Sequence, residues 1–109
     1  MPMPVFDENN EVVEMDTDEI FCIFKDETRR IVVQTESGNY YFPSTIEQIQ
    51  AIMGKYGFYQ IDKNHVINVK QVKAFKRGEV FIDGVHYYVA ARRQKGLMDI
   101  LRRSRNTNV

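Results

Sequence analysis

Short runs of β-branched and aromatic residues, each bounded by turn-forming residues, recur along most of the chain and limit the folds open to it. These runs occupy residues 11–15, 19–25, 29–35, 40–42, 71–77, 79–82 and 85–90. Asp83-Gly84 is typical of a tight β-hairpin, and Gly38 supplies the positive φ expected in the turn at 36–39. A regular alternation of strands and helices would predict a parallel sheet, and the sequence lacks such an alternation. The pattern therefore favours a mainly β domain of seven to ten short antiparallel strands.

Two segments depart from the strand pattern and predict helices. Ser44 and Glu47 have the spacing of a capping box, and Gly57 is placed to end the helix that follows. One face of this helix is apolar through Ile46, Ile49, Met53 and Tyr56. A short C-terminal helix is expected from about Arg93 to Arg103, although Gly96 weakens it by roughly 1 kcal/mol relative to alanine.

The chain has 109 residues, which suits one domain. We expect a flexible segment at 1–10, a folded domain at 11–103 and a frayed tail at 104–109. No apolar run is long enough to span a membrane, and the N-terminus lacks the pattern of a signal peptide. The single cysteine, Cys22, lies in an apolar run and is expected to pack in the core. A cytoplasmic location is the natural expectation.

Residues with catalytic or metal-binding chemistry are sparse and scattered. His65, His86 and Cys22 lack the close spacing of metal ligands. There is no glycine-rich phosphate loop, and no serine has the setting of a nucleophile elbow. The sequence therefore predicts a protein that is not an enzyme and that needs no metal and no cofactor.

Charge is divided unevenly although the net charge is zero. Residues 1–28 hold nine acids and one base, whereas residues 29–109 hold six acids and fourteen bases. Basic clusters fall at strand ends and turns: Arg29-Arg30, Lys63, and Arg92-Arg93-Lys95. Such groups suit phosphate oxygens, and arginine also suits the guanine edge. A basic working surface and an ordinary solvated surface both remain open on charge alone.

A polar break, Asp62-Lys63-Asn64-His65, interrupts the apolar stretch 58–69. Phe58 precedes the break, Val66-Ile67-Asn68 follows it, and the pair Arg92-Arg93 comes after two further strands. In this order, "GFYQIDKNHVINVKQVKAF" and "VFIDGVHYYVAARRQKGLMDIL" resemble the LytTR-type DNA-binding domain of bacterial transcription regulators. The resemblance covers roughly residues 11–103. It implies an elongated antiparallel β-β-β arrangement of about ten short strands, with one central short helix and a short C-terminal helix.

The resemblance also implies a target, which is double-stranded DNA contacted by loops that enter successive major grooves. The expected base-edge contacts are Arg29, Lys63, Asn64 and Arg92. The expected phosphate contacts are Arg30, Lys70, Lys73, Lys76, Arg77, Arg93 and Lys95. We expect repeated half-sites and a homodimer on DNA, because one small module contacts few bases. Asn68 is expected to hydrogen-bond local backbone and not to read a base.

Several positions differ from the pattern of the family. Gln60, Asp62, Asn64 and Ala91 stand where it commonly has arginine, histidine, serine and serine. A carboxylate at 62 repels phosphate unless it pairs with Lys63 or Arg92 or turns away. The main alternative is therefore a protein-interaction module with weak or no DNA binding, motivated by Asp62, the acidic residues 7–19 and the strand "VHYYV". Single-stranded nucleic acid stacked on exposed tyrosines is a third hypothesis.

Overall fold

The computed structural model describes residues 1–106 as two antiparallel sheets with two α-helices. The ten strands are β1 (Pro2–Phe6), β2 (Val12–Asp16), β3 (Ile20–Lys25), β4 (Ile31–Thr35), β5 (Gly38–Tyr41), β6 (Phe58–Asp62), β7 (His65–Asn68), β8 (Ala74–Lys76), β9 (Glu79–Ile82) and β10 (Val85–Tyr88). The helices are α1 (Ile46–Met53) and α2 (Ala91–Asn106). Short 3₁₀ turns occupy Thr17–Glu19, Gly54–Tyr56 and Val69–Gln71. The predicted fold class is confirmed, with α2 longer than expected.

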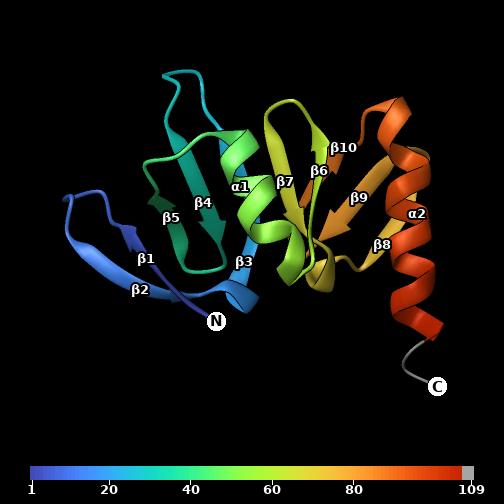
Figure 1. The fold of residues 1–109 in the computed structure, drawn as a ribbon, viewed down its shortest axis with the longest axis horizontal. Coiled ribbons are helices and arrows are strands. Elements are labelled where there is room, and N and C mark those ends of the chain that lie inside the picture. Colours follow the sequence, from blue (N-terminus) through green and yellow to red (C-terminus); the bar gives the residue numbers. More distant parts are fainter. Residues whose placement is uncertain (107–109) are drawn as a thin grey trace.

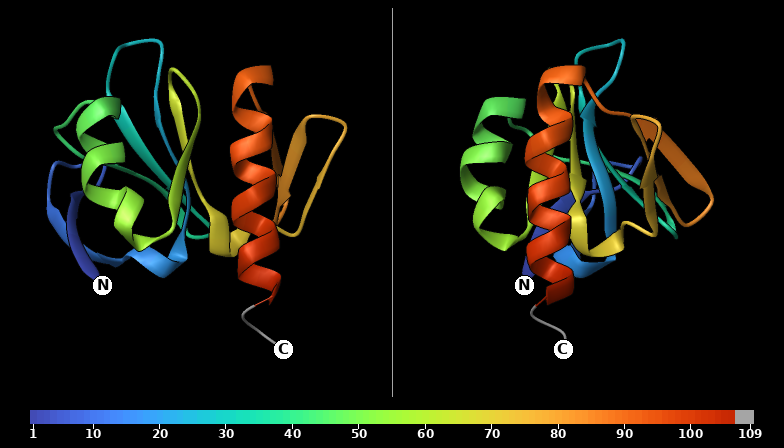
Figure 2. Two further views of the ribbon diagram at one scale, coloured as in Figure 1. Left: turned by 45° about the vertical axis from the view of Figure 1, so that its right-hand side comes forward. Right: turned by 90° about the vertical axis from the view of Figure 1, so that its right-hand side faces the viewer.

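The larger sheet has seven strands in the order β2-β1-β5-β4-β3-β7-β6, and the smaller has the order β10-β9-β8. The molecule is elongated, with extents of 41 × 30 × 27 Å, and the β1–β2 hairpin and α2 lie toward opposite ends (Figure 1). Figure 2 shows α1 and the smaller sheet on opposite sides of the larger sheet. No helix within residues 1–106 has the length and apolar character needed to cross a membrane.

Two apolar clusters fill the space on either side of the larger sheet. One joins Ile49 and Met53 of α1 to Ile23 and other inward residues of the sheet. The second joins Ile67 and the fully buried Leu97 of α2 to the smaller sheet and to other residues of the larger one. Cys22 is fully buried in the second cluster, as predicted. Burial also raises the pKa of the Cys22 thiol, because a thiolate is poorly solvated there.

Helix α1 begins one residue later than the predicted cap. Thr45 has an extended backbone, and its Oγ1 accepts a hydrogen bond from Gln48 N at 3.1 Å. Gln48 Oε1 in turn accepts from Thr45 N at 3.2 Å, which completes a capping box. The prediction of a capping box is therefore right, but its residues are Thr45 and Gln48 and not Ser44 and Glu47. Tyr56 is 43% exposed because a tighter 3₁₀ turn after Met53 breaks the helical spacing.

The N-terminal segment contains a strand, where the sequence predicted a flexible segment at 1–10. Strand β1 pairs with β2 along its whole length, and Met3 and Val5 are buried. Pro2 and Pro4 are tolerated because β1 pairs with β5 only at Phe6 and Tyr41, so their missing N–H groups remove no bond on that side.

Three further boundaries differ from the predictions. Arg29 and Arg30 belong to the β3–β4 loop, since β4 begins at Ile31. The expected strand 71–77 is divided into a 3₁₀ turn and the short β8. At the C-terminus, α2 continues through Asn106, so the first half of the expected frayed tail at 104–109 is helical. Positions 107–109 lie outside the described residues.

Candidate nucleic-acid interface

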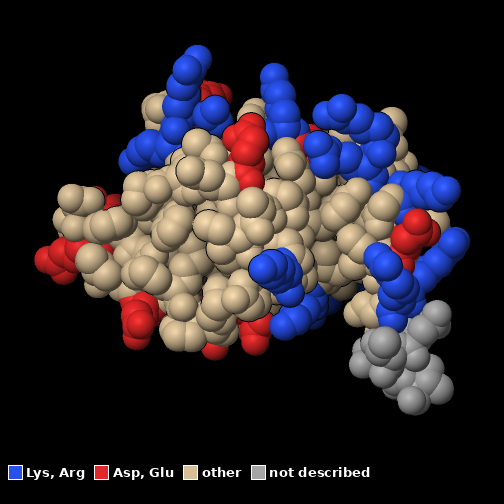
Figure 3. Space-filling view, viewed as in Figure 1, with Lys and Arg blue, Asp and Glu red and all other residues tan. Residues whose placement is uncertain are grey.

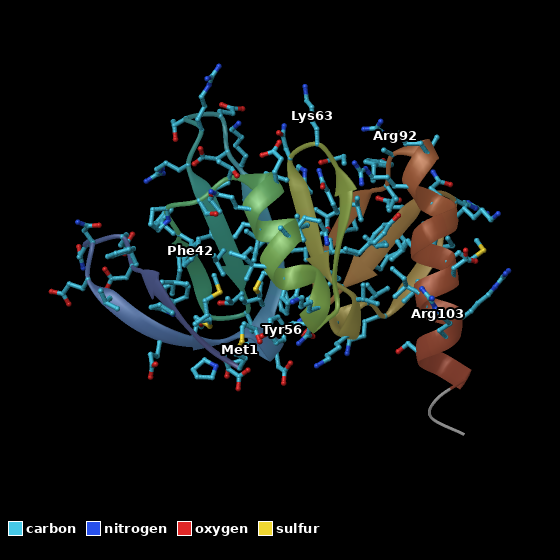
Figure 4. The ribbon with its side chains drawn as sticks, in the orientation of Figure 1. Met1, Phe42, Tyr56, Lys63, Arg92 and Arg103 are labelled. Atoms are coloured by element: carbon cyan, nitrogen blue, oxygen red, sulfur yellow. The ribbon has the colours of Figure 1, made fainter. Side chains whose placement is uncertain are left out.

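Three turns project from one edge of the molecule. They are the β3–β4 loop, the β6–β7 turn and the start of α2, and Lys63 and Arg92 extend outward from this edge in Figure 4. Backbone hydrogen bonds tie them together. Lys25 N donates to Asn64 O at 2.9 Å, and Ala90 N donates to Ile61 O at 2.8 Å. The turns therefore keep a fixed spacing, and Figure 3 shows basic side chains along this edge.

Asp26 shapes the β3–β4 loop. Its Oδ1 accepts hydrogen bonds from Thr28 Oγ1 at 2.8 Å, from Thr28 N at 2.9 Å and from Arg30 N at 2.9 Å. The bond from the Thr28 hydroxyl, followed by that from the Arg30 amide, lowers the pKa of the Asp26 carboxyl. The acid is therefore engaged within the loop and keeps the two arginines at its end in place.

The two arginines of this loop differ in freedom. Arg30 Nε lies 3.3 Å from Thr28 Oγ1 and 3.4 Å from Asp26 Oδ2, and its guanidinium carbon lies 4.4 Å from the centre of the Tyr41 ring. Arg29 has a φ of 68°, which is uncommon for a residue with a Cβ. Its exposed side chain has no hydrogen-bond or ion-pair partner among residues 1–106. Arg30 is thus held in position, whereas Arg29 is available for a ligand.

The β6–β7 turn shows what becomes of Asp62. Its Oδ1 accepts a hydrogen bond from Asn64 N at 2.7 Å and lies 2.9 Å from His65 Nδ1. His65 also stacks on Phe24, with ring centres 5.5 Å apart. The carboxylate therefore closes the turn and pairs with neither Lys63 nor Arg92. Lys63 is exposed at the tip, and in the described chain its ammonium has no partner.

The start of α2 is held closely against β6. Tyr59 Oη donates to Arg93 O at 2.9 Å. A Cβ added at Gly96 would lie only 2.3 Å from Tyr59 Oη. Arg93 Nη1 donates to Gln60 O at 3.4 Å, and its buried Nε has no partner among the described atoms. Arg92 is exposed, and the described residues offer its guanidinium no partner. This close packing fixes the position of Arg92 on the edge.

The remaining basic candidates are distributed over several surfaces. Arg77 lies in the β8–β9 turn, which is beside the start of α2 because Val89 N donates to Gly78 O at 2.9 Å. Lys95 is exposed one turn further along α2. The ammonium of Lys76 lies 5.5 Å from the centre of the Phe81 ring.

Lys70 and Lys73 lie away from the three turns. Lys70 follows the end of β7 opposite Lys63, and its Nζ is 3.2 Å from Asp18 Oδ1. Lys73 lines a cleft with five acids, which are Asp16, Asp18, Glu19, Glu36 and Asp83. The structure therefore does not bring these two lysines together with Arg29, Lys63 and Arg92.

Asn68 has the structural role expected of it. It is 1% exposed, and its Nδ2 donates to Ile20 O at 3.0 Å and to Thr17 O at 3.3 Å. Its Oδ1 accepts from Lys70 N at 3.2 Å. These bonds join the ends of β3 and β7 and leave no group of Asn68 for a base.

The sequence profile of the LytTr DNA-binding domain matches residues 10–102. The match covers most of the chain and includes all three turns. The chain belongs to the LytTr DNA-binding domain family. This family consists of DNA-binding domains and not of enzymes. A comparison with curated proteins finds no match.

A solved LytTr structure supports the same fold. It is the LytTr DNA-binding domain of a protein described as a methyl-accepting/DNA response regulator from Bacillus cereus. The TM-score is 0.78 with 10% sequence identity, over 92% of this chain and 95% of the other. At this identity, the comparison establishes a shared arrangement of strands and helices.

The sequence analysis did not identify one basic residue at the edge from which the three turns project. Lys25 ends β3 with an exposed side chain, and its backbone N–H is bonded to Asn64 O in the β6–β7 turn. It appeared only as the polar end of the apolar run 19–25. Its proximity to the β6–β7 turn arises from the pairing of β3 with β7, which lie far apart in the sequence.

Within residues 1–106, no group of three or more His, Cys, Asp or Glu side chains is arranged to hold a metal ion. His65 contacts Asp62, and His86 contacts Glu79 and stacks on Phe81. Each histidine therefore has an acidic partner within its own sheet region.

Proposed function

We propose that this domain binds double-stranded DNA sequence-specifically as part of a bacterial transcription regulator, and that its three turns enter successive grooves. The observation that carries this proposal is the presence of Arg29, Lys63 and Arg92 on one edge, each exposed and without a partner in the described chain. Unpaired guanidinium and ammonium groups on rigid turns are suited to phosphate oxygens and base edges. Membership of a DNA-binding family supports the same target.

The side chains divide into two proposed roles. Arg29, Lys63 and Arg92 are assigned to base edges, with Asn64 as a reader of adenine. The phosphate contacts assigned to flanking positions are Lys25, Arg30, Lys76, Arg77, Arg93 and Lys95. Lys70 and Lys73 are omitted because the first is paired with Asp18 and the second lies among acids. Repeated half-sites would supply the contacts that one small domain lacks.

Fluorescence anisotropy across a salt series tests the target. A randomised duplex library is first enriched on the protein, and the selected and scrambled duplexes are then compared. We expect the logarithm of the association constant to fall with that of salt by about 0.9 per phosphate contact. No binding to either duplex at about 50 mM salt would overturn the proposal.

Single substitutions test the two roles with a matched control. Arg92→Ala should weaken binding to the selected duplex by about 1–3 kcal/mol and reduce the preference over the scrambled duplex. Arg77→Ala should weaken both alike and make the salt slope shallower by about one contact. Lys73→Ala removes the same type of charge from the far surface and should leave both affinities unchanged. Equal losses from Lys73 and Arg92 would contradict the assigned edge.

A protein-interaction role is the second candidate, and the exposed acidic β1–β2 hairpin favours it. An acidic surface does not suit DNA, so it is free for another contact. If the domain were only such a module, the duplexes of the salt series would show no selective binding while the domain remained folded.

A further inference from the structure

A cleft opens beside the β3–β4 loop, where three strands of the larger sheet begin or end. Phe6 is the last residue of β1, Tyr41 is the last of β5, and Ile31 is the first of β4. Phe6 pairs with Tyr41, and Phe42 N donates to Ile31 O at 3.1 Å, so the three ends are held together. The cleft has a volume of about 450 Å³, within the range of about 300–1,000 Å³ that is usual for small-molecule sites.

Aromatic side chains form much of the lining of this cleft. Phe6, Tyr41 and Phe42 are large and yet only half-buried, and all three line it. Figure 4 shows Phe42 well away from Arg92 along the long axis, so the cleft does not extend under the start of α2. Partly exposed aromatic rings on a paired sheet are a suitable surface for a planar ring of a ligand.

The charged part of the lining is basic. Arg29 and Arg30 line the cleft, and no acid is among the described residues that do so. The guanidinium carbon of Arg30 lies 4.4 Å from the centre of the Tyr41 ring, so one cation already lies over the aromatic lining. The polar contacts of Arg30 within its own loop involve Nε, and Arg29 has no partner among residues 1–106. Both arginines therefore retain terminal nitrogens for an anion.

We propose that this cleft binds a small planar aromatic anion, whose ring packs on the aromatic lining while Arg29 and Arg30 hold its acidic group. A carboxylate or a phosphate accepts paired hydrogen bonds from guanidinium groups, which also supply the opposite charge. A cationic ligand would be repelled by the two arginines, and a neutral one would leave Arg29 without a counter-charge. Aryl carboxylates and mononucleotides share the required chemistry.

A free small molecule suits the cleft better than a base of duplex DNA. A base in a duplex reaches such a cleft only if it leaves its stack, and this unstacking costs free energy. A free aromatic acid meets no such cost. Its ring and its charge are also close enough to use the aromatic and basic parts of one small cleft together.

The ligand would regulate DNA binding, and this consequence rests on the proposed function. Arg29 is assigned to a base edge and Arg30 to a phosphate. An anion bound between them would neutralise both groups and hold Arg29 at the cleft, so the β3–β4 loop would lose its DNA contacts. Lys63 and Arg92 do not line the cleft. A saturating ligand should therefore weaken binding to DNA as far as loss of the contacts of this loop does.

NMR titration of the backbone amides of the whole chain, without DNA, tests the site. Naphthoate is the carboxylate probe, adenosine monophosphate is the phosphate probe, and naphthamide is the neutral match of naphthoate. We expect saturable shifts at Arg30 and Phe42 with naphthoate, and a dissociation constant on the order of 0.1–1 mM for a ligand of this size. Naphthamide should bind at least about tenfold more weakly. The tighter of the two anions identifies whether a carboxylate or a phosphate is preferred.

Three variants separate the charge contact from the ring contact. Arg29→Gln should weaken naphthoate binding about tenfold and change naphthamide binding much less. Lys63→Gln removes one positive charge from the neighbouring turn and is the matched control, which should leave naphthoate binding unchanged. Tyr41→Leu should weaken the binding of both probes, because both lose the same ring contact. Circular dichroism of each variant excludes loss of the fold as the cause.

Three outcomes overturn the inference. These are no saturable shift with either anion up to about 10 mM, equal affinities for naphthoate and naphthamide, or equal losses from Arg29→Gln and Lys63→Gln. Binding to the selected duplex is then measured with saturating ligand and should weaken about tenfold or more, whereas an unchanged affinity would overturn the link to DNA. If the natural chain without ligand bound no duplex, the proposed function would fail, while the titration without DNA would still decide whether the cleft is a site.

Discussion

Replacement of Gly96 by alanine tests how closely α2 is held against β6. In an isolated helix this substitution is stabilising by roughly 1 kcal/mol, because alanine restricts the unfolded chain and favours the helix. Here the added Cβ would lie 2.3 Å from Tyr59 Oη and 3.2 Å from Tyr59 Cζ. Inserting a methyl group into such a contact costs about 1–3 kcal/mol. Because 2.3 Å is well inside van der Waals contact, we expect a net loss of about 1–2 kcal/mol.

Urea unfolding followed by circular dichroism measures this loss. Gly54→Ala is the matched control, because its Cβ would meet only the amide end of Gln50, which can rotate at the cost of one long bond to Phe58 O at 3.4 Å, and Gly54 has a helical backbone. That variant should be as stable as the natural chain or more so. Tyr59→Phe removes the oxygen that Gly96→Ala would strike. The double variant should therefore lose less free energy of unfolding than the sum of the two single variants.

The reasoning fails if Gly96→Ala is as stable as Gly54→Ala, or if its effect simply adds to that of Tyr59→Phe. Either result would mean that α2 moves away from Tyr59 at little cost. In that case the hydrogen bond from Tyr59 Oη to Arg93 O would not fix the start of α2. The position of Arg92 would then need another explanation.

Two further predictions concern the loops. Asn68→Ala should lower the free energy of unfolding by about 2–4 kcal/mol in urea titrations. The substitution leaves Thr17 O, Ile20 O and Lys70 N without their partner. An equally stable variant would contradict the role of these bonds. For Asp26, the folded pKa is lowered by the Thr28 hydroxyl, so its stabilisation is complete above the unfolded pKa and is lost as the pH falls through the folded pKa. Asp26→Asn should therefore have a lower urea midpoint than the natural chain at about pH 7, and the difference should shrink as the pH falls. A difference that grows toward acid would reverse the sign of the argument.

The elements that follow from local chemistry were predictable. Asp83-Gly84 forms the β9–β10 turn, with Gly84 at a φ of 76°, because few residue pairs accept that backbone. The capping box of α1 was placed one residue early because Ser44 and Thr45 are both competent caps. Only the extended backbone of Thr45 decides between them. Strand β1 was missed because its two prolines normally oppose a strand, and they are tolerated where the partner strand is paired at a single position.

The site was predictable only in part, because its geometry depends on contacts between distant residues. Arg29, Lys63 and Arg92 reach one edge through the pairing of β3 with β7 and the docking of α2 on β6. Lys70 looked equally suitable in the sequence, yet it meets Asp18, which is 52 residues away. The sequence left open whether Asp62 repels DNA, pairs with Lys63 or Arg92, or turns away. It turns toward His65, a contact that the sequence did not indicate.

Asp62 also has an evolutionary consequence. The β6–β7 turn is closed by this carboxylate and the β3–β4 loop by that of Asp26, so neither is held by the side chain of Lys63 or Arg29. Lys63 can therefore change freely, and Arg29 can change to residues that accept its φ of 68°, without loss of the scaffold that presents them. Lineages of this domain would acquire new target preferences by substitution at these two positions while both loops stayed closed. A library randomised at 63 should retain the stability of the natural chain more often than one randomised at 26 and 62.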